Sequence, residues 1–281
     1  MHSAKQILDD VVGKIGEKYE PMEARNIAAI LLEDSFSISK EDILLDEKVA
    51  IDLDRLENCV VRLLQNEPIQ YVTGQTHFLG RIFKVQKGVL IPRPETEELV
   101  RMIVDANIVV NPKILDVGAG SGCIAISLAL ETHGKAAGLD VSEDALRIAK
   151  ENSSALGGSI EFILHDILSS NPPISELDIL VSNPPYIPER DKKQMHDNVL
   201  GFEPKIALFV SDDNPLIFYQ RISTFGKGAL KPGGKLYFEL HEEYADEVKS
   251  LVEDLGYSEV IVHKDMQGKN RMLSATNSAN R

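Results

Sequence analysis

Four consecutive residues, Asn183, Pro184, Pro185 and Tyr186, could together activate a planar nitrogen for attack on a methyl group. The lone pair of an amide or ring-amino nitrogen is shared with a neighbouring π system, so an activating site needs hydrogen-bond acceptors aimed at the N–H bonds. The side-chain carbonyl of Asn183 and the nearby backbone carbonyls are such acceptors, and neither proline has an N–H group that would compete. Tyr186 adds a flat face for stacking. The same residues would also fit a plain turn, because Asn-Pro is a common turn signal.

A second group of residues has the spacing of a nucleoside-binding loop. The apolar segment 114–117 leads into five small residues, Gly118, Ala119, Gly120, Ser121 and Gly122. Glycines let the backbone pass close to a ligand, and the start of the helix that follows offers free N–H groups. Asp140 ends the next apolar segment, where a doubly wound sheet would place its carboxylate beside ribose hydroxyls. These residues predict a cofactor that contains a nucleoside.

Details of this loop favour S-adenosylmethionine over a dinucleotide. The position that would complete the Gly-x-Gly-x-x-Gly pattern is Cys123. Asp116 would be poorly placed beside a pyrophosphate but well placed near an ammonium group, and S-adenosylmethionine has an ammonium group and no phosphate. Asp166, after a third apolar segment, could reach the adenine amino group or could simply cap a turn after His165.

These loops require a parallel sheet to position them. Strand-like segments at 113–117, 135–139, 160–164, 179–181 and 235–240 alternate with helix-like segments at 122–131, 143–156 and 216–230. Alternation of this kind is typical of a doubly wound α/β sheet, whose ligands bind at the carboxyl ends of the strands. Segments 259–262 and 271–275 flank a glycine-containing turn and predict a closing antiparallel hairpin.

The first part of the chain predicts a separate helical domain. Apolar residues recur at helical spacing in 7–15, 24–36 and 52–66, and residues 39–42 look like the capped start of a further short helix. We therefore expect a helical domain at 1–70, a β-hairpin linker at 71–92 and a catalytic domain at 93–281. The helical domain has no glycine-rich loop and no catalytic cluster, so it either docks a partner or acts as a stabilising cap.

Composition excludes several classes of function. The 281 residues include 30 basic and 44 acidic side chains, and residues 1–75 and 76–281 each have a net charge of −7. Neither part is therefore a basic module for binding nucleic acid. Two distant cysteines form no metal-ligand pattern, and the sequence contains neither a leader-like start nor an apolar run of membrane-spanning length. We expect a soluble cytoplasmic monomer that binds no membrane, no metal and no nucleic acid directly.

The motifs in combination resemble class I methyltransferases that modify planar nitrogens. Residues 68–74, 90–97 and 202–208 narrow the resemblance to the bacterial release factor glutamine methyltransferases, the HemK/PrmC family, over essentially the whole chain. This resemblance implies a Rossmann-like class I methyltransferase fold with S-adenosylmethionine as cofactor. It also implies methyl transfer to the side-chain amide nitrogen of the glutamine in the Gly-Gly-Gln motif of peptide-chain release factors.

The resemblance implies roles for particular residues. The loop 118–122 and Asp140 would contact the cofactor, and Asp166 and Ile167 would lie beside the adenine, where this family often has an aromatic residue. Residues 183–186 would clamp the substrate amide, with Asn183 near both ligands. Arg93 and Glu97 would lie on the rim of the active site, although they would equally fit a solvated pair at a helix start. No histidine is required, so we expect structural or surface positions for His77, His165 and His196.

Two other functions stay open at this stage. An amino-methyltransferase acting on adenine or guanine in DNA or RNA would share the Asn-Pro-Pro-Tyr sequence but would need a basic binding surface. A regulator that only binds the cofactor would not need an intact Asn-Pro-Pro-Tyr sequence.

Overall fold

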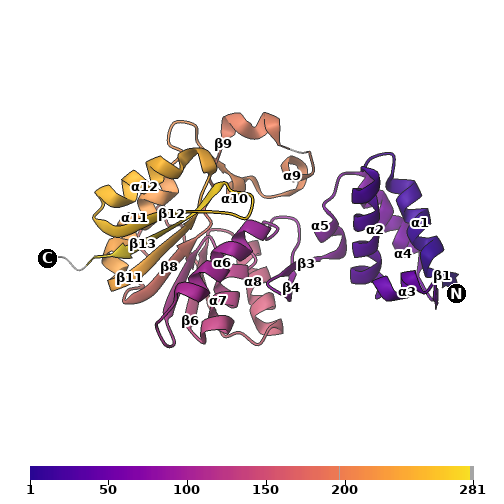
Figure 1. Cartoon of the computed structure of the whole chain (residues 1–281), viewed down its shortest axis with the longest axis horizontal. Helices are drawn as coiled ribbons and strands as arrows, with labels where there is room; N and C mark the ends of the chain where they lie inside the picture. The colour runs from indigo at the N-terminus through magenta and orange to yellow at the C-terminus, as the bar shows by residue number, and fades with distance from the viewer. Residues whose placement is uncertain (196, 279–281) are drawn as a thin grey trace. The chain divides into compact units, whose positions relative to one another are not determined.

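The computed structural model describes residues 1–195 and 197–278, so His196 lies outside the described residues. The chain forms two compact units (Figure 1). The first comprises Met1–Gln75 together with Val85–Lys87 and Met195–Phe202, and the second comprises the rest of the chain. Each unit has a hydrophobic core of its own.

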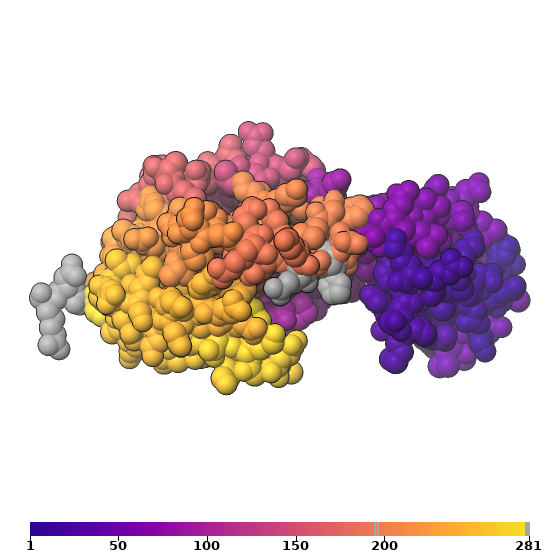
Figure 2. All heavy atoms as spheres, turned by 90° about the horizontal axis from the view of Figure 1, so that it is seen from above, coloured from indigo at the N-terminus to yellow at the C-terminus, as the bar shows by residue number. Residues whose placement is uncertain are grey.

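The first unit is a small helical bundle. Its helices are α1 (Ala4–Ile15), α2 (Pro21–Phe36), α3 (Lys40–Leu44), α4 (Leu53–Leu64), α5 (Ile69–Thr73) and α9 (Asp197–Phe202), and the short strands β1 (His2–Ser3) and β2 (Lys48–Val49) pair antiparallel. Ser3, Ser39 and Asp52 cap three of the helices with side-chain oxygens, which explains where these helices begin. The apolar faces of α1, α2 and α4 supply most of the core, and the indigo atoms in Figure 2 form a closely packed body.

The second unit contains a seven-stranded sheet with the strand order β12-β13-β11-β8-β5-β6-β7. Strands β5 (Lys113–Val117), β6 (Lys135–Asp140), β7 (Glu161–Leu164), β8 (Leu177–Ser182) and β11 (Leu230–Glu239) run parallel. The hairpin of β12 (Tyr257–Lys264) and β13 (Asn270–Asn277) closes the sheet antiparallel to β11. These strands confirm the predicted doubly wound sheet and its closing hairpin.

Alternate side chains of the central strands enter cores on opposite faces of the sheet. Leu115 and Leu180 pack with α11 (Ile217–Ala229) and α12 (Ala245–Asp254) on one face. Ile114 and Ile179 pack with α6 (Pro94–Ala106), α7 (Cys123–Thr132) and α8 (Glu143–Ala155) on the other. Because both faces of the parallel strands are covered, their sequences read as nearly continuous apolar runs.

The predicted hairpin is formed by β3 (Gln75–Phe78) and β4 (Arg81–Lys84). Phe78 and Phe83 meet edge to face, with ring centroids 5.8 Å apart, and both are buried in the core beside α6 and α7. The hairpin is thus anchored within the second unit. No helix in the described part of the chain is both long and apolar enough to cross a membrane.

The segment between β8 and α11 contains short elements that the sequence did not predict. They are β9 (Ile187–Pro188), the 3-10 helix η1 (Glu189–Gln194), α10 (Lys205–Leu208) and β10 (Phe209–Val210), and β9 pairs with β10. A second 3-10 helix, η2 (Glu242–Tyr244), follows β11. These elements are too short to produce a recognisable apolar period.

Candidate active site

The topology of the sheet brings the two chemical motifs together. Strand β5 lies between β6 and β8, so the strand order reverses beside it, and this is where open α/β sheets bind ligands. Val117 pairs with Ser182 at the carboxyl ends of β5 and β8. The residues that follow these two, the glycine loop and Asn183-Pro184-Pro185, therefore emerge side by side.

A cavity of about 280 Å³ opens at the carboxyl ends of these strands. It is lined by four groups of residues from the second unit: 117–121 at the end of β5 and in the glycine loop, 139–142 at and after the end of β6, 165–168 after β7 and 182–185 at and after the end of β8. Leu90, Pro92, Arg93 and Thr96 also line it, and Pro204, Ile206 and Ala207 contribute from α10 and the residue before it. Most of the predicted site residues thus meet in one cavity.

The glycine loop has the backbone conformation that only glycine adopts without strain. Gly118, Gly120 and Gly122 have φ angles of 81°, 55° and 81°. Gly118, Gly120 and their neighbours Ala119 and Ser121 line the cavity, but Gly122 does not. A Cβ atom on Gly122 would lie 3.0 Å from the side chains of Ile126 and Phe162, so Gly122 permits close packing of α7 against the core.

Asp140 presents its carboxylate to the cavity and also holds the loop. Its Oδ2 accepts a hydrogen bond from the Gly120 N–H at 2.8 Å, and its Oδ1 accepts one from the Ser142 N–H at 2.9 Å. Burial raises the pKa of this carboxyl above its ordinary value. Each oxygen keeps a second lone pair that can accept a hydrogen bond from a ligand hydroxyl.

The residues after β7 offer a polar and an apolar surface. Asp166 is exposed, and its Oδ1 accepts a hydrogen bond from the Leu168 N–H at 2.9 Å, while Ile167 is buried. His165 also lines the cavity, with Nε2 3.0 Å from the Ser170 carbonyl. Asp166 therefore caps this turn and also lines the cavity.

Asn183 directly follows β8 and is held through its side-chain amide. Its Nδ2 donates a hydrogen bond to Thr96 Oγ1 at 3.2 Å, and the preceding Ser182 hydroxyl donates one to the Val117 carbonyl at 2.6 Å. Asn183, Pro184 and Pro185 line the cavity. Tyr186 does not line it: its hydroxyl donates to Glu239 Oε1 at 3.0 Å and its ring meets His241 edge to face.

Arg93 and Glu97 have different positions. Arg93 lines the cavity and forms an ion pair of 2.6 Å with Glu203, whose side chain is 1% exposed. Glu97 does not line the cavity, and its carboxylate accepts a hydrogen bond from the Leu79 N–H in the β3–β4 turn at 3.0 Å. The structure therefore separates the two residues that were expected together on the rim.

The expected position of Asp116 near a ligand ammonium is wrong. Asp116 is fully buried, does not line the cavity, and its Oδ2 accepts a hydrogen bond from the Ala125 N–H of α7 at 3.2 Å. Burial raises the pKa of this carboxyl to about 7. Cys123 does line the cavity, and burial raises the pKa of its thiol to about 12, so the thiol is protonated at neutral pH.

Three functional candidates were missed by the sequence analysis: Thr96, Glu203 and Glu239. Glu239 interrupts the apolar run 236–240 and is the last residue of β11, and a carboxylate in such a run is a signal of a buried partner. Burial raises the pKa of the Glu239 carboxyl above its ordinary value. Thr96 and Glu203 lie within residues 90–97 and 202–208, which carry the family resemblance, but the sequence did not indicate their roles, because their partners are distant in sequence.

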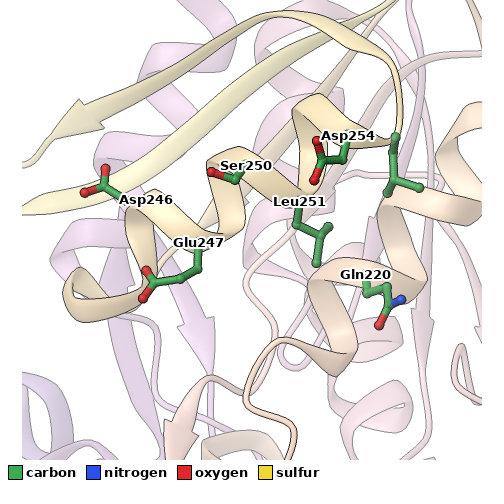
Figure 3. A pocket seen from close by; sticks show the side chains of 7 residues that line it. Gln220, Asp246, Glu247, Ser250, Leu251 and Asp254 are labelled. Carbon is green, nitrogen blue, oxygen red and sulfur yellow. The ribbon is translucent and has the colours of Figure 1, made fainter.

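A separate hollow lies between α11 and α12 (Figure 3). Asp246, Glu247 and Asp254 of α12 line it together with Ser250, Leu251, Leu255 and Gln220. It contains no residue of the glycine loop or of Asn183-Pro184-Pro185-Tyr186. Within the described part of the chain, no group of three or more His, Cys, Asp or Glu side chains could hold a metal ion.

Comparison with known proteins shows what this chain is similar to. Residues 95–200 match the family model of the methyltransferase small domain, and residues 8–74 match that of the PrmC N-terminal domain. The chain is 43% identical to the release factor glutamine methyltransferase of Bacteroides thetaiotaomicron, over 92% of this chain and 94% of that protein.

Solved structures are similar in fold at low sequence identity. A methyltransferase from Pyrococcus furiosus matches with a TM-score of 0.55 and 18% identity, over 79% of this chain and all of that one (100%). The Thermus thermophilus 16S rRNA methyltransferase RsmC, in complex with AdoMet and guanosine, matches with a TM-score of 0.52 and 17% identity, over 72% of this chain and 49% of that one. Both likenesses support the class I methyltransferase fold.

Proposed function

The chain belongs to the family of release factor glutamine methyltransferases, and from this premise we propose the reaction that it catalyses. It transfers a methyl group from S-adenosylmethionine to the side-chain amide nitrogen of the glutamine in the Gly-Gly-Gln motif of peptide-chain release factors. The observation that carries the proposal is the convergence of the glycine loop, Asp140 and Asn183 on one cavity.

The cavity suits S-adenosylmethionine. Asp140 would accept hydrogen bonds from the ribose hydroxyls, and the loop 118–121 lets the backbone approach the cofactor closely. Asp166 and the buried Ile167 would contact the adenine. Among the described residues that line the cavity, Arg93 is the one Arg or Lys, and it is paired with Glu203, which fits a cofactor without phosphate groups.

The protein's part in the reaction is to supply hydrogen-bond acceptors and alignment. S-adenosylmethionine, when bound, supplies a methyl group on a positively charged sulfur. Asn183 Oδ1 and the backbone carbonyls beside it would accept hydrogen bonds from both N–H groups of the substrate amide. These bonds strengthen as the nitrogen loses conjugation and becomes positive, so they favour the transition state over the ground state.

No general base is needed in this scheme. The methylated amide nitrogen carries a positive charge and loses one proton to water, and the electron pair of the broken methyl–sulfur bond stays on sulfur. Alignment of the two reactants can contribute roughly 7–11 kcal/mol in favourable cases. The described cavity supplies rigid groups for that alignment, two prolines and a side-chain amide held by Thr96.

We propose that the helical unit docks the release factor. It has a core of its own, which does not depend on the residues that line the cavity. A short glutamine peptide would lack these remote contacts and should be a much poorer substrate than the intact release factor. The net charge of −14 supports a protein partner over bare nucleic acid, and a cytoplasmic monomer remains our expectation.

The function is tested by offering labelled S-adenosylmethionine with separate pools of release factor, tRNA, rRNA and DNA. We expect label in the release factor pool alone. The control is a release factor whose Gly-Gly-Gln glutamine is replaced by alanine, which should take up no label. Label in a nucleic-acid pool would instead support an amino-methyltransferase that acts on bases.

A further inference from the structure

The buried carboxylate of Glu239 has two donors and no role in the scheme above. Glu239 ends β11, which lies beside β8, and it is 1% exposed. Its Oε2 accepts a hydrogen bond from Thr96 Oγ1 at 2.6 Å, and its Oε1 accepts one from the Tyr186 hydroxyl at 3.0 Å. One carboxylate therefore contacts the last residue of the Asn-Pro-Pro-Tyr sequence directly and reaches the first through Thr96.

Thr96 carries the effect of this carboxylate to Asn183. Its side chain comes from the first turn of α6 and is 3% exposed. A threonine hydroxyl has a single proton, and Thr96 donates it to Glu239 Oε2. The Thr96 oxygen can then only accept, and it does so from Asn183 Nδ2 at 3.2 Å.

This chain of bonds selects one of two orientations of the Asn183 amide. Rotated by half a turn, the amide would place its oxygen against the Thr96 oxygen and its NH₂ group where a substrate N–H must bind. In the observed orientation the NH₂ group is occupied, and no donor in the described part of the chain is bound to Oδ1. The acceptor on which the proposed reaction depends is thereby left free.

We propose that Glu239 and Thr96 are positioning residues that fix the Asn183 amide with its oxygen available to the substrate amide. The inference rests on the proposed function and extends it to residues outside the Asn-Pro-Pro-Tyr sequence. Neither residue needs to touch the reacting atoms, because both act through the orientation of Asn183.

The test compares Thr96→Val with Thr96→Ser in methyl transfer to the intact release factor. Valine keeps the shape of threonine but removes the hydroxyl, whereas serine keeps the hydroxyl. We expect Thr96→Val to lower kcat about ten- to one-hundred-fold, because the Asn183 amide loses the partner that fixes its orientation. The KM for release factor and the Kd for S-adenosylmethionine should change little, and Thr96→Ser should retain most of the wild-type kcat.

A double-mutant comparison separates positioning from a general structural effect. If Thr96 acts through Asn183, adding Thr96→Val to Asn183→Ala should slow single-turnover transfer no further. An equal further loss in that background would overturn the inference, as would a Thr96→Val enzyme with more than about half of the wild-type kcat. Glu239→Gln gives a second variant, in which an amide replaces the carboxylate, and an unchanged kcat there would remove Glu239 from the assignment.

The wild-type enzyme in the same assay distinguishes this inference from the proposed function. Wild-type transfer to release factor with unaffected variants would overturn the inference and leave the function intact. A wild-type enzyme that methylates no release factor would overturn the function, and the inference with it.

Discussion

Asp140 and Asn183 present oxygen acceptors to the same cavity but are held in different ways. Asp140 is bound to the backbone N–H groups of Gly120 and Ser142, whereas Asn183 is bound to a side chain of α6. Their effects should therefore separate, with Asp140 affecting cofactor binding and Asn183 affecting turnover.

Asp140→Ala should weaken the binding of S-adenosylmethionine by roughly 1–3 kcal/mol, the range for lost hydrogen bonds to a charged acceptor. Calorimetric titration of the cofactor measures it. Asp144→Ala is a matched control, because Asp144 lies on the first turn of the following helix with a side chain 73% exposed. Equal cofactor affinities of the two variants would remove Asp140 from the site.

Asp116→Asn should change how stability depends on pH. Burial raises the pKa of Asp116 from 3.8 to about 7, so between these values the folded protein binds a proton that the unfolded chain has lost. The folded state of the wild type therefore loses stability as pH rises through this window, and the asparagine variant does not.

Denaturant unfolding at several pH values measures this difference. Relative to Asp116→Asn, the wild type should lose on the order of 4 kcal/mol between pH 4 and pH 8, from about three pKa units at 1.36 kcal/mol each. Parallel stability curves for the two proteins would show that the buried carboxyl does not titrate in this range.

At the scale of elements, the reversal of strand order beside β5 determines where the site forms. The glycine loop follows β5 and the Asn-Pro-Pro-Tyr sequence follows β8, and these strands are hydrogen-bonded neighbours. The alternating pattern predicted this convergence, because parallel strands end at one edge of a sheet. It could not predict Thr96 or Glu239, whose contact joins α6 to β11 across 143 positions of sequence.

Gly122→Ala tests the packing between the glycine loop and α7. Gly122 and Gly157 have similar positive φ angles of 81° and 73°, but a Cβ atom would be crowded at Gly122 and would meet nothing within 4 Å at Gly157. Backbone strain should cost each alanine variant roughly 1–2 kcal/mol. Gly122→Ala should lose about 1–3 kcal/mol more through overpacking. Thermal or urea unfolding of both variants measures the difference, and equal losses would contradict a packing role.

At the scale of the whole molecule, we propose that substrate docking and chemistry belong to different units. The helical unit was predicted from its apolar periodicity, and the capped helix start at Ser39 could be read from the sequence, whereas the cap at Asp52 is seen only in the structure. The short elements between residues 187 and 210 could not be read from the sequence, because they are positioned by contacts such as the Arg93–Glu203 ion pair.

Deleting residues 1–70 should raise the apparent KM for intact release factor about tenfold or more, from a loss of ~1.4 kcal/mol or more of remote binding. The Kd for S-adenosylmethionine should stay nearly unchanged, because the cavity is lined by residues of the second unit. Circular dichroism and a melting curve must first show that the shortened chain folds. If the folded variant methylates intact release factor as efficiently as the full chain, the helical unit is only a structural cap.

The most direct test of the account is mass-spectrometric location of the methyl group on an intact release factor after a single turnover. With the wild-type enzyme we predict one added methyl group, on the side-chain amide of the Gly-Gly-Gln glutamine. With Asn183→Ala we predict at most about a tenth of that product, although calorimetry should show S-adenosylmethionine still bound, because the lost acceptor acts mainly on the reacting nitrogen. Methylation at any other residue by the wild type, or undiminished methylation by Asn183→Ala, would contradict the account.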